Sequence, residues 1–375
     1  MIGRRSKSPP PLRGRSIREA DREGGSFRPG ARQLPPSLSL PLKGGGNSPC
    51  IRRRAFLALM ASAATWPLAA RAQQTAMLVI GFLNAGSPTE RAAFVAAFLH
   101  GLEEEGFVEG KNIAVLYRWA EGRYDRLPTL AADLVNRNVA AIAAADAPSA
   151  MAAKAATTAI PIVFQTGADA LQTGLVSHLD HPEANLTGIN EIAGPLPAKR
   201  LGLLHELVPT ATTVGLLINP QNDNAKYDAA IVREAAHAIG LKLILAEAAT
   251  EGDLTAAFAS LARDRVSALV VNTDVFLTGH RDLIVALAAR YALPSIFPFR
   301  EYAAAGGLMS YGVNLPSIYR QVGTYVGKIL KGAKSAELPV IQPTKFDFVV
   351  NLKTAETLQL KFPPGLLAIA DEVIE

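Results

Sequence analysis

Polar residues follow most of the apolar segments of this chain, in positions where side chains can hold a small molecule. The set comprises Asn84, Gly86 and Ser87; Asp146 and Ser149; Gln165, Thr166 and Asp169; Asn219 and Asn222; and Asn272 and Asp274. Their amides, hydroxyls and carboxylates form hydrogen bonds, and a helix that begins beside them offers unpaired N–H groups that attract a carboxylate. Ser, Asp and Asn are also common helix N-caps, so either role fits each residue alone. Their recurrence favours a binding cleft.

The sequence offers little for catalysis. No G-x-G-x-x-G follows a predicted strand, and the chain has neither G-x-x-x-x-G-K-[ST] nor G-x-S-x-G. His178 and His181 form an H-x-D-H sequence in a proline-containing loop, where a surface turn is a better interpretation than a metal site. The other histidines stand singly on predicted helices, and no nucleophile is paired with a base. The sequence therefore favours binding over turnover, with no catalytic residue, metal or cofactor.

Short apolar runs alternate with stretches of helical length from about residue 77 onward. Predicted strands lie at 77–83, 113–117, 139–144 and 160–164, and predicted helices at 89–105, 124–137 and 149–158. We expect the first helix to turn Ala92, Val95, Ala96, Leu99 and Leu102 toward the core. Strands alternating with helices predict parallel sheets covered on both faces, with ligands bound beyond the carboxyl ends of the strands.

The same order of elements recurs about 135 residues later. Strands are predicted at 214–218, 241–246, 268–273 and 293–297. Asn219 follows its strand as Asn84 does, and Gly240 and Gly106 stand where helix C-caps are expected. The sequence thus predicts an α/β fold of two Rossmann-like lobes that face each other.

A segment near the amino terminus has the features of an export signal. Three arginines at 52–54 precede Phe56 and an apolar stretch over 58–70, and Ala-Arg-Ala stands before Gln73. We expect cleavage between Ala72 and Gln73, and a periplasmic mature protein. The twin arginine resembles a Tat signal, with the Sec route as the alternative. A membrane anchor fits less well, because the apolar stretch is shorter than the ~20 residues of a spanning helix.

The residues before that signal do not resemble a domain. Residues 1–50 are rich in Pro, Gly, Ser and Arg, a composition that cannot bury enough apolar surface to offset chain entropy. We interpret them as a disordered extension or as the result of a start site placed too early. In the second case translation begins near Ile51, and 51–72 is the signal.

Removing the leader reverses the charge of the protein. Residues 1–72 contain 14 of the 38 basic residues and 3 of the 33 acidic residues, so 24 basic and 30 acidic residues remain. A mature chain with a net charge of about −6 lacks the basic patch expected of a nucleic-acid-binding protein. Cys50, the one cysteine of the chain, also lies in the leader. The mature protein is thus expected to have no disulfide, thiolate metal site or cysteine nucleophile.

Short motifs spread over 77–375 resemble those of the ABC-transporter substrate-binding proteins, in the tryptophan-binding-like group. They are GFVEGKN at 106–112, IPIVF at 160–164, TGLV at 173–176, NLTG at 185–188, AGGLMSYG at 305–312, KILKGA at 328–333, PTKF at 343–346 and NLKTA at 351–355. The resemblance implies the type I periplasmic binding protein fold. Its two lobes would be 77–191 with 301–341 and 192–300 with 342–375, joined by three hinge crossovers near 191–195, 298–300 and 341–343.

The resemblance also implies a function. Such a protein closes its lobes on a small solute and delivers it to an ABC permease in the inner membrane, with its ATPase, and no bond is broken. We expect a monomer. The chain departs from the family at 167–171, GADAL in place of GTDPV, and at 182–185, PEAN in place of PGGN. These changes alter loop stiffness beside the cleft, so the expected solute is an amino acid or another small carboxylate rather than tryptophan in particular.

Three more residues extend the candidate ligand-binding site. Arg300 can hold a carboxylate in a bidentate manner, or form a surface ion pair at the hinge. Tyr302 and Tyr311 can supply a wall of the cleft. Two other functions stay open: a sensor that reports the same kind of solute to a membrane receptor, and an enzyme on the same fold.

Overall fold

The computed structural model describes residues 77–182, 184–191 and 196–375. The predictions for the leader, 1–72, and for the hinge residues 192–195 lie outside these ranges. Within them the chain forms two α/β lobes built on parallel strands, as predicted. No helix in the described ranges is long and apolar enough to cross a membrane.

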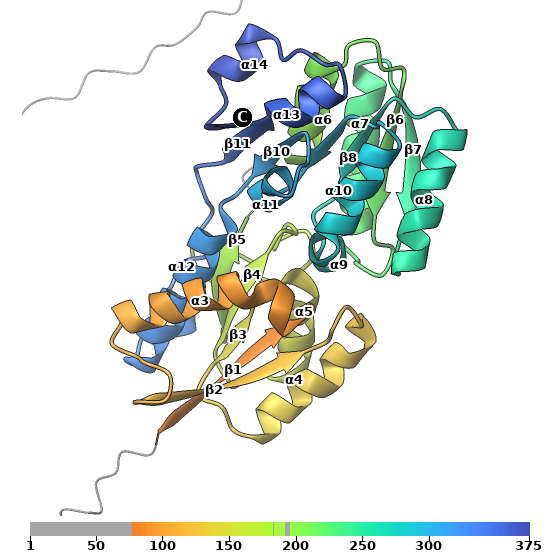
Figure 1. The fold of residues 1–375 in the computed structure, drawn as a ribbon. Coiled ribbons are helices and arrows are strands. Elements are labelled where there is room, and N and C mark those ends of the chain that lie inside the picture. The colour runs from red at the N-terminus through yellow and green to blue at the C-terminus, as the bar shows by residue number, and fades with distance from the viewer. Residues whose placement is uncertain (1–76, 183, 192–195) are drawn as a thin grey trace, which may run out of the picture. The chain divides into compact units, whose positions relative to one another are not determined.

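The first lobe contains a five-stranded parallel sheet in the order β2-β1-β3-β4-β5 (Figure 1). Its strands are β1 (Leu78–Asn84), β2 (Ile113–Trp119), β3 (Ile142–Ala144), β4 (Ile162–Thr166) and β5 (Leu186–Asn190). Its helices are α3 (Pro88–Glu104), η1 (Tyr124–Arg126), α4 (Leu127–Asn136), α5 (Ala147–Ala156), α12 (Leu315–Leu330) and η2 (Ser335–Glu337). Helices α3 and α12 share a core with one face of the sheet, and α4 and α5 with the other. The strands are therefore buried on both sides.

The second lobe contains a seven-stranded sheet in the order β12-β11-β10-β9-β8-β6-β7. Its strands are β6 (Thr213–Ile218), β7 (Lys242–Glu247), β8 (Ala268–Val271), β9 (Ser295–Phe297), β10 (Met309–Gly312), β11 (Asp347–Asn351) and β12 (Glu372–Ile374). Its helices are α6 (Leu196–Leu207), α7 (Ala225–Ala238), α8 (Glu251–Arg263), α9 (Val275–Gly279), α10 (Arg281–Arg290), α11 (Arg300–Ala304), α13 (Leu352–Thr357) and α14 (Pro364–Ala368). Strand β11 is antiparallel to β10, so this sheet is mixed at one end.

The second crossover between the lobes lies later in the chain than the sequence predicted. The predicted hinge at 298–300 placed 301–341 in the first lobe. In the structure β10 pairs with β9 through Met309 and Ile296, because the short helix α11 returns the chain to the same sheet. The chain crosses only after Gly312, before α12 begins. It returns after Ile341, which bridges to Ile189, and before β11.

Local sequence signals explain where the helices begin and end. Ser87 caps α3: its hydroxyl accepts the Glu90 N–H, and the Glu90 carboxylate accepts the Ser87 N–H. Gly106 and Gly240 follow α3 and α7 with φ of 83° and 75°, a left-handed conformation that glycine adopts without strain. The predicted C-caps are therefore confirmed.

The buried face of α3 differs from the predicted face. The helix buries Arg91, Phe94, Phe98, Gly101 and Leu102, whereas the sequence analysis had oriented a set of smaller residues inward. Of that predicted set only Leu102 is fully buried. Two phenylalanines four residues apart bury more apolar area than the alanines beside them, and this sets the rotation of the helix. The same rotation places Arg91 in the interior.

Candidate functional site

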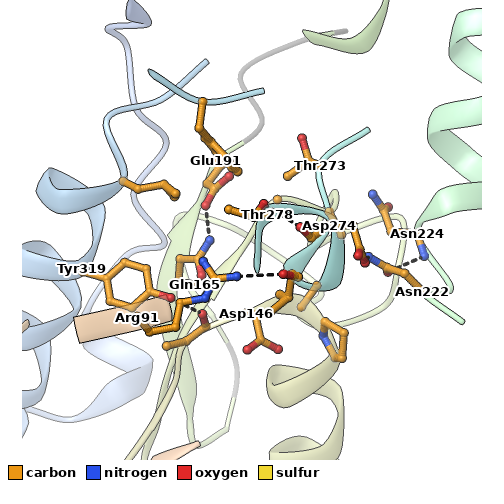
Figure 2. A pocket seen from close by; sticks show the side chains of 18 residues that line it. Arg91, Asp146, Gln165, Glu191, Asn222, Asn224, Thr273, Asp274, Thr278 and Tyr319 are labelled. Atoms are coloured by element: carbon orange, nitrogen blue, oxygen red, sulfur yellow. Dashed lines mark hydrogen bonds between the residues drawn. The ribbon is translucent and has the colours of Figure 1, made fainter. Parts of the chain in front are cut away.

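A small cavity, about 40 Å³ in volume, lies where strand ends of both lobes meet. Figure 2 shows its lining side chains. From the first lobe these include Arg91, Asp146, Gln165, Glu191 and Tyr319, and from the second lobe Asn222, Asn224, Thr273, Asp274 and Thr278. Both lobes thus contribute polar side chains to one cavity, as expected for paired parallel sheets.

Arg91 is the cationic side chain of this cavity. It is 4% exposed, and its Nη2 donates to the carbonyl oxygen of Val275, in the second lobe, at 3.0 Å. Its guanidinium carbon lies 5.6 Å from the centre of the Phe94 ring. The buried Nε has no hydrogen-bond partner among the described residues. A buried donor of this kind costs free energy unless an acceptor reaches it, so Arg91 can hold an acceptor group of a ligand.

Two aspartates line the cavity and also cap helices. Asp146 accepts the N–H groups of Ala85 at 2.7 Å and Ser149 at 2.8 Å, at the start of α5. Burial raises the pKa of Asp146, and these hydrogen bonds oppose that effect. Asp274 begins α9 and accepts the Leu277 N–H at 3.0 Å. Both carboxylates therefore hold the walls of the cavity in place.

Glu191 is a buried carboxyl group at the end of β5, directly before the first crossover. It is 2% exposed and accepts a hydrogen bond from the Gln165 amide. Burial raises the pKa of Glu191 to about 7, although the Gln165 hydrogen bond and the charges of Arg200 and Arg91 lower it. The surroundings of Glu191 therefore determine whether its carboxyl group is ionised near neutral pH.

This pKa predicts a specific pH dependence of stability. In the unfolded chain a glutamate releases its proton near pH 4.5, whereas folded Glu191 retains it to about pH 7. The folded state binds more protons between these values, so the free energy of unfolding falls as pH rises through this window, by about 3 kcal/mol. Urea unfolding at pH 5 and pH 8 should show a smaller fall in Glu191→Gln than in the unchanged protein. Exposed Glu337 provides the control: Glu337→Gln should keep the full fall, and an equal fall in all three proteins would contradict the assignment.

Arg200 lies behind the small cavity, where the lobes are joined. It is 2% exposed, and it donates from Nε to the Tyr311 carbonyl oxygen at 2.8 Å and from Nη1 to the Thr273 hydroxyl at 3.2 Å. Burial lowers the pKa of Arg200 to about 10, while the carboxylates of Asp228 and Glu191 oppose that change. Arg200 thus ties α6 to the ends of β8 and β10.

A larger cavity, about 430 Å³ in volume, adjoins the small one. The two share Ala147, Pro148, Ala168, Asn222 and Asn224. The larger cavity is also lined by Leu127, Met151 and Leu175 of the first lobe, and by the rings of Tyr124 and Tyr227. Asp223 and Lys226 line the larger cavity too, so both cavities combine charged groups with apolar and aromatic ones.

The structure brings five of the predicted residues to these cavities. Asp146, Gln165 and Asp274 line the small cavity, Thr166 lines the large one, and Asn222 lines both.

The remaining predicted residues of the first lobe support the site from behind. Asn84 donates to the Ala145 carbonyl oxygen at 3.1 Å and accepts the Gly86 N–H at 2.8 Å. Ser87 caps α3, and the Ser149 N–H completes the cap of α5. Asp169 accepts backbone N–H groups within its own turn. Ser87 is therefore a helix N-cap, whereas Asn84 and Asp169 stabilise local turns and strand ends within the first lobe.

The predicted residues of the second lobe that lie outside both cavity linings differ in their surroundings. Asn219 donates to Asp274 at 3.3 Å, whereas the amide of buried Asn272 has no hydrogen-bond partner among the described residues. Arg300 forms a bidentate pair with Glu372, with both N–O distances 2.6 Å.

The two predicted wall tyrosines also pack within the second lobe. Tyr302 stacks on Phe297 with ring centres 4.8 Å apart, and Tyr311 packs against Phe346. Arg300, Tyr302 and Tyr311 lie away from the cavities because the chain crosses after Gly312 rather than at 298–300.

The sequence did not predict four residues at this place: Arg91, Glu191 and Tyr319, which line the small cavity, and Arg200, which lies behind it. Tyr319, on α12, donates from its hydroxyl to the Ala145 carbonyl oxygen at 2.9 Å. Arg91 carried a usable signal, since it precedes Phe94 and Phe98 by three and seven residues and so shares their helix face. A basic residue on the apolar face of a helix becomes buried, and its charged group then needs a partner in the interior.

Comparison with known proteins identifies the family. Residues 83–374 match the model of the ABC transporter substrate binding protein family, and the chain belongs to that family. A curated relative, the "Tyrosine-binding protein" of Clostridioides difficile (strain R20291), is 24% identical over 264 residues, which cover 70% of this chain and 76% of that protein.

Solved structures show the same fold. A conserved domain protein from Vibrio cholerae O1 biovar El Tor has a TM-score of 0.74 and 26% identity, covering 79% of this chain and 99% of that one. An ABC domain from Streptococcus pneumonia, solved in complex with L-Trp, has a TM-score of 0.73 and 23% identity over the same shares. The predicted family and the type I periplasmic binding protein fold are thus confirmed.

Proposed function

We propose that this protein binds a small carboxylate-containing solute between its lobes and delivers it to an ABC importer. The observation that carries the proposal is Arg91, a buried guanidinium with an unpartnered Nε in a cavity lined by both lobes. A ligand carboxylate would satisfy that donor and gain a charge-assisted hydrogen bond. Glu191 lines the same cavity, and its ionised carboxylate would accept a hydrogen bond from the ammonium group of an amino acid.

The larger cavity supports a solute with an apolar body. Its volume, about 430 Å³, falls in the range of about 300–1,000 Å³ typical of small-molecule sites. The curated relative is named for tyrosine, and the Streptococcus protein was solved with L-Trp. We therefore expect an amino acid or another carboxylate with its charged end beside Arg91 and its side group toward Tyr124 and Tyr227.

Delivery requires closure and a partner. Because the cavity takes residues from both lobes, the site is complete only when the lobes meet, and movement about the three crossovers would close it. Substrate-binding proteins of ABC transporters act outside the cytoplasm, and this agrees with an exported protein that starts near Gln73. A permease with its ATPase would then recognise the closed form. We expect no covalent change in the solute.

A thermal-shift screen tests the proposal. We would heat the purified protein with L-tyrosine, L-tryptophan, the other amino acids and benzoate, each in excess. A ligand at 100 times its dissociation constant adds about 2.7 kcal/mol to the free energy of unfolding and should raise the midpoint by several degrees. Chromatography of the recovered solute should show it unchanged. No shift with any carboxylate, or a chemically altered solute, would contradict the proposal.

A further inference from the structure

We propose that Tyr124 is a clasp between the two lobes, which favours the closed form through bonds that involve no solute. Tyr124 belongs to the first lobe, in η1, and the ring lines the larger cavity. Its hydroxyl donates to Asp274 Oδ2, in the second lobe, at 2.9 Å. The same hydroxyl accepts the N–H of Phe276, also in the second lobe, at 3.2 Å. One oxygen thus makes two hydrogen bonds across the cleft.

The second-lobe side of this contact is held rigidly. The Asp274 carboxylate accepts hydrogen bonds from Asn219, Asn222 and the Leu277 N–H, in addition to Tyr124. The aspartate therefore cannot turn away without losing several partners at once. A fixed charged acceptor makes a stronger hydrogen bond to a hydroxyl than a neutral one does.

Other first-lobe residues meet the same segment of the second lobe. Arg91 donates to the Val275 carbonyl oxygen at 3.0 Å. Gly279 lies so near α3 that a Cβ at this position would be 2.6 Å from a Glu90 carboxylate oxygen. Residues 274–279 are therefore the part of the second lobe on which residues from α3 and η1 close. Each bond made here lowers the free energy of the closed form and biases the equilibrium between lobe positions.

The consequence for function rests on the proposed solute binding. A bond present only in the closed form must break before solute leaves, so Tyr124 would slow release without touching the charged end of the solute. Tyr124 is thus a positioning residue, and the clasp itself can be tested with no solute present.

Pulsed electron spin resonance on the full chain would measure the lobe positions. Cys50→Ser removes the one cysteine of the sequence, and Asn136→Cys on α4 and Glu234→Cys on α7 place one spin label on each lobe at an exposed site. In this background Tyr124→Phe keeps the ring and removes the bridging oxygen. We expect the ratio of open to closed molecules to rise about tenfold, as for the loss of a charged hydrogen bond.

Tyr227→Phe is the matched control. Tyr227 lines the same cavity from the second lobe, and its hydroxyl makes no hydrogen bond to the first lobe within the described part of the chain. Its label distances should equal those of the parent. Equal distances in Tyr124→Phe and the parent, or equal shifts in both variants, would overturn the clasp. Because no solute is used, this result is independent of the outcome of the thermal-shift screen.

Discussion

Replacing Arg91 by glutamine is expected to weaken solute binding by about 100-fold or more. The side chain is buried in the small cavity, and Arg91→Gln removes the one cationic group that lines it, so a bound carboxylate would lose its charged partner. Truncating one member of a buried charged pair costs about 2–5 kcal/mol, and 1.4 kcal/mol is a factor of ten in affinity. Isothermal titration with the solute that gives the largest thermal shift would measure the change.

Arg300→Gln is the control for this measurement. The sequence left Arg300 as either a carboxylate ligand or a surface ion pair, and the structure pairs it with Glu372 at the exposed edge of the second lobe. We expect its affinity to stay within about twofold of the unchanged protein, because an exposed ion pair contributes little. Normal binding by Arg91→Gln together with weak binding by Arg300→Gln would reverse the assignment.

The second large effect is expected in folding. Helices α3 and α12 cross with their backbones in contact: a Cβ at Gly323 would overlap the Phe98 carbonyl oxygen, and one at Gly101 would overlap the Arg320 carbonyl oxygen. Alanine usually stabilises a helix relative to glycine by about 1 kcal/mol. Here Gly323→Ala must push α12 away from α3, and we expect a loss of about 3 kcal/mol in the free energy of unfolding.

Gly202→Ala is the same substitution at a position where we expect the opposite change in the free energy of unfolding. Gly202 lies within α6, and a Cβ there would meet nothing within 4 Å. We expect this variant to gain about 0.5–1 kcal/mol. Urea unfolding of the two variants beside the parent would measure both values. Equal effects of the two substitutions would show that the backbone contact between α3 and α12 does not limit the packing.

The sequence predicted the fold better than the site, for physical reasons. Strands such as 214–218 are apolar runs bounded by polar residues, and the repeated strand-helix order predicted two lobes built on parallel sheets. The second crossover was misplaced because α11 and β10 are short and carry little periodic signal. Strand β10 joins the sheet only through its pairing with β9 and β11.

The sequence placed the candidate site at strand ends, where the cavities lie, but it did not predict several of the side chains that line them. Asp146 and Ser149 have the side chains of both caps and ligands, and only the folded chain shows that Asp146 oxygens already accept backbone N–H groups. Arg91 was missed because the buried face of α3 was assigned from Ala92, Val95, Ala96, Leu99 and Leu102 rather than from Phe94 and Phe98. The pKa of Glu191 depends first on its burial and then on Gln165 and Arg200, and the sequence around Glu191 indicates none of these.

Hydrogen–deuterium exchange with and without bound solute tests the central claim most directly, because it reports both lobes in one measurement. If one solute is held between the lobes, saturating it should slow exchange in two separate segments. These are the start of α5 at 145–149 in the first lobe and the start of α9 at 274–278 in the second. Protection confined to one lobe, under conditions in which the solute is fully bound, would contradict a shared site between them.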